Sequence, residues 1–286
     1  MPLLRVHGVS VSVDGFSAGP RQSVTDPMGV GGMALHEWLL QTRTFKQMHA
    51  VSELTAREGD GSNTVDEDFA ARGFVGVGAW IIGRNMFGPT RGPWSDGSWR
   101  GWWGDTPPFH RPVFVLTNHP REPLVMKGGT TFHFVTGGIE EAYERATAAA
   151  EGQDVRLGGG AHTIRQYLAA RLVDHMHLAA SPVLLGSGEL LLVGLDLRAL
   201  GYEVAEQVSS RAATHIVIRR TVCSHACRCA ARSSGGGAVD APSSSSRTFV
   251  RRRRRRPTPA ERKEPPLMEG RLFSFIGLAG FEPTTS

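Results

Sequence analysis

Cysteine is nearly missing from this sequence, and long apolar runs are missing altogether. Its three cysteines, Cys223, Cys227 and Cys229, all lie beyond residue 220, so the part before it can form no disulfide, which fits a reducing compartment. No run approaches the roughly 18 apolar residues of a membrane span, and the opening MPLLRVHGVS is too short in apolar residues for a signal peptide. We therefore expect a cytoplasmic protein without a membrane partner.

Most of the chain carries almost no net charge. The 286 residues have a formal net charge of +5, but residues 221–286 hold 12 Lys and Arg against 5 Asp and Glu, which leaves 20 against 22 in residues 1–220. This near-neutral body gives no general reason to bind nucleic acid, so we expect no specific nucleic-acid partner. A hydrophobic content of 40% is enough to bury a core.

The tail at 221–286 differs in kind from the body. It is low in complexity and carries six arginines at 251–256, so we expect a disordered, basic segment. Its end, GLAGFEPTTS, contains Gly-Phe-Glu-Pro, which a self-complementary string similar to a transfer-RNA T-arm can encode, and we hypothesise read-through or frameshifted translation. If the tail is genuine, an alternative function is open: nucleic-acid binding through the tail, on a catalytically degenerate fold.

The body alternates between strand and helix periodicity. Strands are predicted at 9–13, 112–117, 131–136, 173–186 and 213–220, and helices at 65–80, 139–150 and 164–172. A capping box at Thr64 and Glu67 marks the start of the first helix. This alternation predicts an α/β fold with helices on both faces of the sheet. The irregular segments 15–63 and 88–111, the second with four of the six tryptophans, are expected to wall a pocket.

Three short motifs could hold a phosphate. Gly158–Gly160 follow a strand and open a helix, where backbone N–H groups favour anions, but their spacing is not G-x-G-x-x-G, so a plain turn is an equal alternative. Arg84, in GRN at 83–85, suits a ribose 2′-phosphate, or is simply solvated. Thr117 and Asn118 directly follow a strand, where α/β sheets bind ligands, or begin a turn.

In this order the motifs carry a resemblance to a known family. Gly83-Arg84-Asn85, Leu116-Thr117-Asn118 and the three glycines are followed by LVDHMHLAASPVLLGSG, and SVDG stands at 12–15. The chain resembles the dihydrofolate reductase-like superfamily over roughly residues 3–220. Within it, the chain is closely similar to the reductase domain of the bifunctional riboflavin-biosynthesis deaminase/reductase.

The resemblance implies a fold and a cofactor. The fold would have three layers, with a central, mostly parallel mixed sheet, and residues 1–220 would form one NADPH-dependent reductase domain that pairs as a homodimer. Arg84, Thr117 and Asn118 would hold the adenosine 2′-phosphate side. The Gly159-Gly160 backbone, often cis in relatives, would pack against the diphosphate and nicotinamide, and Thr163 would offer a hydroxyl. The implied cofactor-binding set is Gly83, Arg84, Asn85, Thr117, Asn118, Gly158, Gly159, Gly160 and Thr163.

The resemblance also implies hydride transfer to a C=N or C=O group, as in 5-amino-6-(5-phosphoribosylamino)uracil reductase. Phe16 replaces an arginine of the riboflavin-pathway enzymes, and the deaminase domain is absent, so the substrate stays open to heterocyclic or ribosylamino-pyrimidine-like molecules. Asp14 is the candidate general acid if burial raises its pKa; the alternative is that it stabilises the turn with Gly15. His175 and His177 share a strand face without a third ligand, so we expect no metal.

Overall fold

The computed structural model describes residues 2–48, 64–89, 92–94 and 98–221. All of them lie in one compact unit. The basic run, the cysteines and the rest of the tail predicted to be disordered fall outside the described residues, apart from Thr221. Within the described residues, no helix has both the length and the apolar character needed to cross a membrane.

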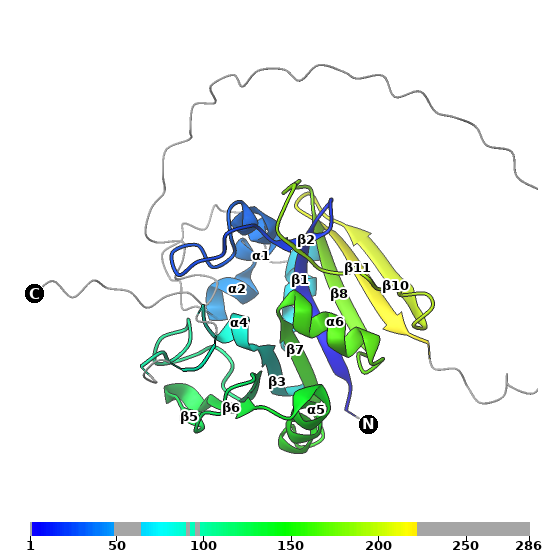
Figure 1. The fold of residues 1–286 in the computed structure, drawn as a ribbon. Helices are drawn as coiled ribbons and strands as arrows, with labels where there is room; N and C mark the ends of the chain where they lie inside the picture. Colours follow the sequence, from blue (N-terminus) through cyan, green and yellow to red (C-terminus); the bar gives the residue numbers. More distant parts are fainter. Residues whose placement is uncertain (1, 49–63, 90–91, 95–97, 222–286) are drawn as a thin grey trace, which may run out of the picture. The chain divides into compact units, whose positions relative to one another are not determined.

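A mixed sheet of nine strands forms the centre of this unit, in the order β10-β11-β8-β1-β7-β3-β4-β6-β5 (Figure 1). The six strands from β8 to β6 are parallel, whereas β5, β11 and β10 pair antiparallel with their neighbours. This confirms the predicted mostly parallel mixed sheet. The strands are β1 Leu4–Ser12, β3 Val77–Gly83, β4 Pro112–Leu116, β5 Leu124–Val125, β6 Thr131–Val135, β7 Asp154–Gly159, β8 His175–Ser181, β10 Tyr202–Ser209 and β11 Thr214–Arg220; β2 Phe16–Ala18 and β9 Glu189–Leu190 form a separate pair.

Helices cover both faces of the sheet, as predicted. The α5 and α6 helices pack on one face, where alternate strand residues such as Ile81 and Leu157 are fully buried. On the other face Trp38 of α1 and Phe69 of α3 form one apolar cluster, and Trp80 packs in a second cluster with Trp103. The helices are α1 Glu37–Leu40, α2 Arg43–Met48, α3 Val65–Arg72, α4 Arg84–Phe87, α5 Gly138–Ala149 and α6 Ala161–Ala169, with short 3₁₀ segments at Gly32–His36 and Lys127–Gly129.

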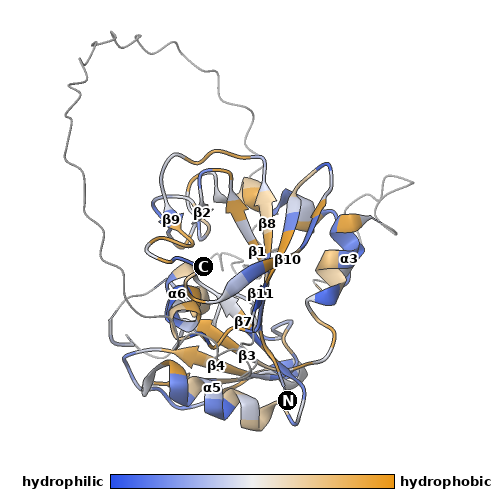
Figure 2. Ribbon diagram, turned by 90° about the vertical axis from the view of Figure 1, so that its right-hand side faces the viewer, coloured by the Kyte–Doolittle hydropathy of each residue, from blue (hydrophilic) through white to orange (hydrophobic). Residues whose placement is uncertain are grey.

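The hydropathy of the ribbon follows this layering. In Figure 2 the strands β3 and β4 are largely hydrophobic, whereas α3 and α5 alternate between hydrophilic and hydrophobic residues. All seven residues of β3 are buried, since helices and loops cover both of its faces. A strand that is buried on both sides carries no polar alternation, so its sequence reads as one continuous apolar run.

The prediction of a helix over 65–80 is wrong beyond Arg72. Its start is correct, because the Thr64 hydroxyl accepts a hydrogen bond from the Glu67 N–H at 3.2 Å. The helix ends before Gly73, and Gly76 turns the chain with a φ of 69°. The apolar residues that follow enter β3, since a buried strand and a buried helix cannot be distinguished by periodicity alone.

A buried hydrogen-bonded chain joins β1, β8 and β11 to α3. The Gly8 N–H donates to Nδ1 of His177 at 3.2 Å, so His177 carries its proton on Nε2 and donates to Nδ1 of His215 at 3.0 Å. His215 then donates from Nε2 to the Asp66 carboxylate at 2.7 Å. Burial, followed by electrostatic interaction with His7 and His215, lowers the pKa of His177 to about 2, so His177 contributes a neutral imidazole to this hydrogen-bonded chain.

This burial predicts acid sensitivity. A histidine in the unfolded chain titrates near 6.5, so below that pH the unfolded state binds more protons than the folded state. The free energy of unfolding should therefore be fully maintained above pH 6.5 and fall as the pH drops below it, by about 1 kcal/mol per pH unit for His177. Urea unfolding at pH 7 and pH 5 should show this loss, and His177→Gln should show a smaller one.

The control for this prediction is His110→Asn, at an exposed position. It should lose as much stability between pH 7 and pH 5 as the unmodified protein. A loss in His177→Gln as large as in His110→Asn would contradict a neutral, buried His177.

Candidate functional site

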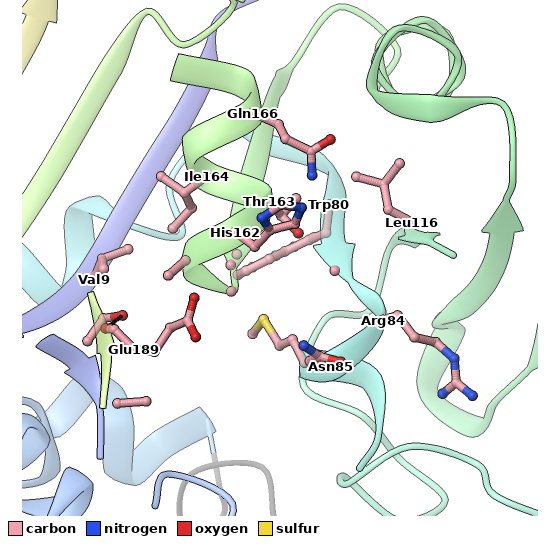
Figure 3. A pocket seen from close by; sticks show the side chains of 18 of the residues that line it. Val9, Trp80, Arg84, Asn85, Leu116, His162, Thr163, Ile164, Gln166 and Glu189 are labelled. Carbon is pink, nitrogen blue, oxygen red and sulfur yellow. Dashed lines mark hydrogen bonds between the residues drawn. The ribbon is translucent and has the colours of Figure 1, made fainter. Parts of the chain in front are cut away.

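A cavity of about 710 Å³ lies at the carboxyl ends of β3, β4 and β7 (Figure 3). This volume is typical of a pocket for a small ligand. Asp14 is not among the described residues that line it. The lining includes every residue predicted to bind the cofactor: Gly83, Arg84, Asn85, Thr117, Asn118, Gly158, Gly159, Gly160 and Thr163.

The strand register explains why these distant segments meet. Strand β3 lies between β4 and β7 and runs parallel to both, so the three strands end at the same edge of the sheet. Gly83 is paired with Leu116, and Ile82 is paired with Gly159. The residues that follow each strand therefore leave the sheet side by side, where ligands of α/β proteins bind.

The glycine turn places the start of α6 at the cavity. The Gly159–Gly160 peptide bond is cis, and Gly160 is the N-cap of α6. A Cβ added to Gly160 would meet no atom within 4 Å, so the backbone is accessible from the cavity at this point. The first turn of α6 contains no acidic residue. Free N–H groups and the positive end of the helix dipole favour an anion here, which supports a phosphate site over a plain turn.

Gly83 and Thr163 pack closely against each other in the site. A Cβ on Gly83 would lie 2.3 Å from the Thr163 hydroxyl oxygen, a distance that real Cβ contacts do not reach. Thr163 itself is buried in the first turn of α6. The end of β3 therefore rests directly on α6, and glycine is the residue that permits this contact.

The other end of the cavity carries cationic and amide groups. The Arg84 side chain extends from α4 away from α6 (Figure 3), and its guanidinium carbon lies 3.2 Å from the ring centroid of Trp94. Arg121 stacks on the same ring at 4.8 Å. Trp94 donates from Nε1 to the His119 carbonyl at 3.0 Å, which ties the tryptophan-rich loop to the segment after β4.

Thr117 and Asn118 differ in exposure. Thr117 is buried, and its hydroxyl oxygen accepts the His119 N–H at 3.2 Å, so it shapes the turn after β4. Asn118 is exposed at the rim of the cavity, with its amide available to a ligand.

Several lining residues carry no motif and are not predicted from the sequence. Trp80 of β3 and Arg156 of β7 line the cavity from the sheet. His36, the last residue of the 3₁₀ segment before α1, lines it as well. Burial lowers the pKa of His36 to about 4, so its imidazole is neutral. The predicted pocket walls are confirmed for the described parts of both irregular segments, which contribute Ser17, Ala18, Gln22, Pro27, Met28, His36, Gly92, Trp102 and Trp103.

Asp14 lies in a tight turn beside β2. Its carboxylate accepts hydrogen bonds from the Ser12 hydroxyl at 2.6 Å and from the N–H groups of Leu185 at 3.2 Å and Gly186 at 2.7 Å. The Ser12 hydrogen bond is the main cause that lowers the pKa of Asp14, whereas a general acid at neutral pH needs a raised one. These contacts support the turn-stabilising alternative.

The two histidines of β8 have separate surroundings. His177 is bonded to His215 and Gly8, while His175 lies at the start of the strand. Within the described parts of the chain, no group of three or more His, Cys, Asp or Glu residues is arranged to hold a metal ion.

Comparison with known proteins agrees with this architecture. Residues 6–218 match the family model of the RibD C-terminal domain. The chain belongs to the RibD C-terminal domain family. This confirms the resemblance to the riboflavin-biosynthesis reductase domain, and the sheet confirms the predicted α/β fold. No curated protein matches the chain significantly.

Solved structures similar to this RibD C-terminal domain share little sequence with it. A putative riboflavin biosynthesis protein from Shewanella sp. PV-4 is 20% identical with a TM-score of 0.45, over 78% of this chain and 100% of that one. Dihydrofolate reductase from Enterococcus faecalis, complexed with NADP(H) and RAB-propyl, is 12% identical with a TM-score of 0.40, over 77% and 97%. A diaminohydroxyphosphoribosylaminopyrimidine deaminase/5-amino-6-(5-phosphoribosylamino)uracil reductase from Thermotoga maritima is 12% identical with a TM-score of 0.43, over 77% and 57%.

The Gly83 contact gives a double-mutant prediction. Gly83→Ala should destabilise the protein by about 1 to 3 kcal/mol, because the new methyl group overlaps the Thr163 hydroxyl. In a Thr163→Ala background the same change should cost much less, since the next nearest atoms, the Gly159 carbonyl oxygen and the Gly160 nitrogen, lie 3.5 Å away. Urea unfolding of the four proteins measures the difference. Equal costs in both backgrounds would contradict the proposed contact.

Proposed function

We propose that this RibD C-terminal domain is an NADPH-dependent reductase that transfers hydride to a C=N or C=O group of a heterocyclic or ribosylamino-pyrimidine-like small molecule. Its family supports a reductase-type function in riboflavin biosynthesis. The observation that carries the proposal is convergence: nine residues from three separate segments line one cavity, with the backbone N–H groups at the start of α6 at one end and the Arg84 guanidinium at the other.

The α6 end fits a diphosphate. Gly160 leaves the backbone uncovered at the N-cap of α6, and the N–H groups at the start of α6 can donate to phosphate oxygens without a competing carboxylate in the first turn. Thr163 holds α6 against the end of β3 through its contact with Gly83. This end would therefore anchor the centre of the dinucleotide and orient the ring beyond it.

The Arg84 end fits the adenosine 2′-phosphate. A guanidinium can donate two parallel hydrogen bonds to a phosphate, and Asn118 at the rim can add an amide donor. Trp94, stacked at 3.2 Å, restricts the guanidinium to one plane and so reduces the entropy that binding would cost.

Besides holding the cofactor, the protein would orient the reacting groups and shield them from water. Bound NADPH supplies the hydride from its nicotinamide ring. Trp80, Trp102 and Trp103 line the cavity with large apolar surfaces, which limits the access of water to the reacting groups. Cytoplasmic location, the homodimer and the alternative of nucleic-acid binding through the tail stay predictions.

Removal of the Arg84 guanidinium tests the cofactor assignment. In Arg84→Ala the Kd for NADPH should rise by about tenfold or more, because a charge-assisted hydrogen bond to the 2′-phosphate is lost. The Kd for NADH, which lacks this phosphate, should hardly change. Titration of the full chain followed by nicotinamide fluorescence measures both values.

The matched control is Arg145→Ala, an exposed arginine of α5 paired with Glu141 at 3.1 Å. It should bind NADPH like the unmodified protein. No NADPH binding below millimolar concentration, or an equal loss of NADH and NADPH affinity in Arg84→Ala, would refute the assignment.

A further inference from the structure

Arg156 is a buried cation that lines the cavity from β7. Its guanidinium carbon lies 4.4 Å from the ring centroids of both Phe74 and Trp80. Its two terminal nitrogens donate to the carbonyls of Gly73 at 2.7 Å and His7 at 3.0 Å. These partners are neutral, so they position the guanidinium without balancing its charge.

No carboxylate balances Arg156 within the described residues. Its Nε is buried and has no hydrogen-bond partner there. Other half-buried arginines of the fold have acidic partners: Arg5 is paired with Asp154 at 2.9 Å and Arg220 with Asp174 at 2.6 Å. Burial, followed by the charge of Arg5, lowers the pKa of Arg156 to about 9, so the side chain stays cationic at neutral pH.

Two histidines that line the cavity with Arg156 are neutral as well. Burial lowers the pKa of His7 to about 3 and that of His36 to about 4, so neither imidazole carries a charge at neutral pH. Glu189, the acidic residue among the described lining, is paired with Arg165 of α6 at 3.1 Å. A buried charge without a counter-charge is costly, which indicates that a ligand supplies the missing anion.

The position of Arg156 assigns that ligand to the substrate. Arg156 lies two residues before Gly158, on the same face of β7, and is paired with Trp80 of β3. Arg156 therefore lies deeper in the sheet, away from the carboxyl ends of the strands. The glycine turn and Arg84, which are proposed to bind the cofactor, lie at those ends.

We propose that Arg156 binds an oxyanion, a carboxylate or a phosphate, on the compound that is reduced. The proposal rests on the proposed reductase function, because it takes the other two anion sites of the cavity to be used by NADPH. Terminal guanidinium N–H groups not used by Gly73 and His7 can donate to the oxygen atoms of such an anion. Neutral analogues would leave the buried charge unbalanced.

Two matched pairs of pyrimidines test this by calorimetry on the full chain saturated with NADPH. Orotate and uracil differ by a carboxylate, and uridine 5′-phosphate and uridine differ by a phosphate. In at least one pair the anionic member should bind about tenfold more tightly or better, the factor expected of a charge-assisted hydrogen bond, and the preferred pair identifies the anion. Equal affinities within both pairs would overturn the proposal.

Variants assign the preference to Arg156. Arg156→Met should abolish it, while Arg145→Met, on the exposed face of α5, should retain it. If Arg156→Met does not fold, Arg156→Gln serves instead, because its amide can still donate to a neighbouring carbonyl while the charge is removed. A full preference in a folded Arg156 variant would overturn the assignment.

Separate NADPH titrations distinguish this proposal from the proposed function. Arg156→Met or Arg156→Gln should bind NADPH with a Kd within about twofold of the unmodified value. If the unmodified chain binds no NADPH, the reductase assignment fails. The pyrimidine titrations are then repeated without cofactor, and the anion preference and its loss in the variants still decide the role of Arg156.

Discussion

The contact between the end of β3 and the first turn of α6 determines the shape of the cavity. Because Gly83 has no side chain, Thr163 can approach its Cα closely, and α6 starts beside the point where α4 begins. The start of α6 and Arg84 therefore line one cavity. The parallel register of β3, β4 and β7 brings the segments together, and this contact holds them at the separation that the pocket needs.

The buried and half-buried charged side chains of the described residues differ in their partners. Arg156, which has no acidic partner among the described residues, faces the cavity, whereas Arg5 and Arg220 are paired with carboxylates that help to join the sheet. The buried histidines His177 and His215 are linked to Asp66 in a chain that joins α3 to the sheet. This distribution supports the proposal that the cavity binds anions.

Much of the fold could be predicted from the sequence because its periodicities are clear. The strands at 112–117 and 131–136 and the helix at 139–150 were predicted close to their observed bounds. The segment 77–80 was assigned to a helix because β3 is buried on both faces and lacks polar alternation. Strand β10 is missing from the prediction, because it is a largely exposed edge strand in which a register shift between Val204 and Glu206 interrupts the alternation of apolar and polar residues.

The site was predictable where a motif marks it. The order of Arg84, Thr117 and Gly158–Gly160 predicted one ligand-binding edge, and the structure brings these residues to one cavity. Arg156 carries no such mark, because its role depends on the absence of an acidic neighbour, and only packing determines that. Asp14 is the opposite case. Its sequence motif is present, but its carboxylate already accepts hydrogen bonds from the Ser12 hydroxyl and the Gly186 N–H.

A crystal structure of the complex with NADPH would show whether this cavity binds the cofactor, and in which orientation. We expect the diphosphate on the N–H groups at the start of α6, next to Gly160, and the adenosine 2′-phosphate on Arg84. A dinucleotide bound outside the cavity, or bound in reverse with its nicotinamide on Arg84, would contradict this expectation.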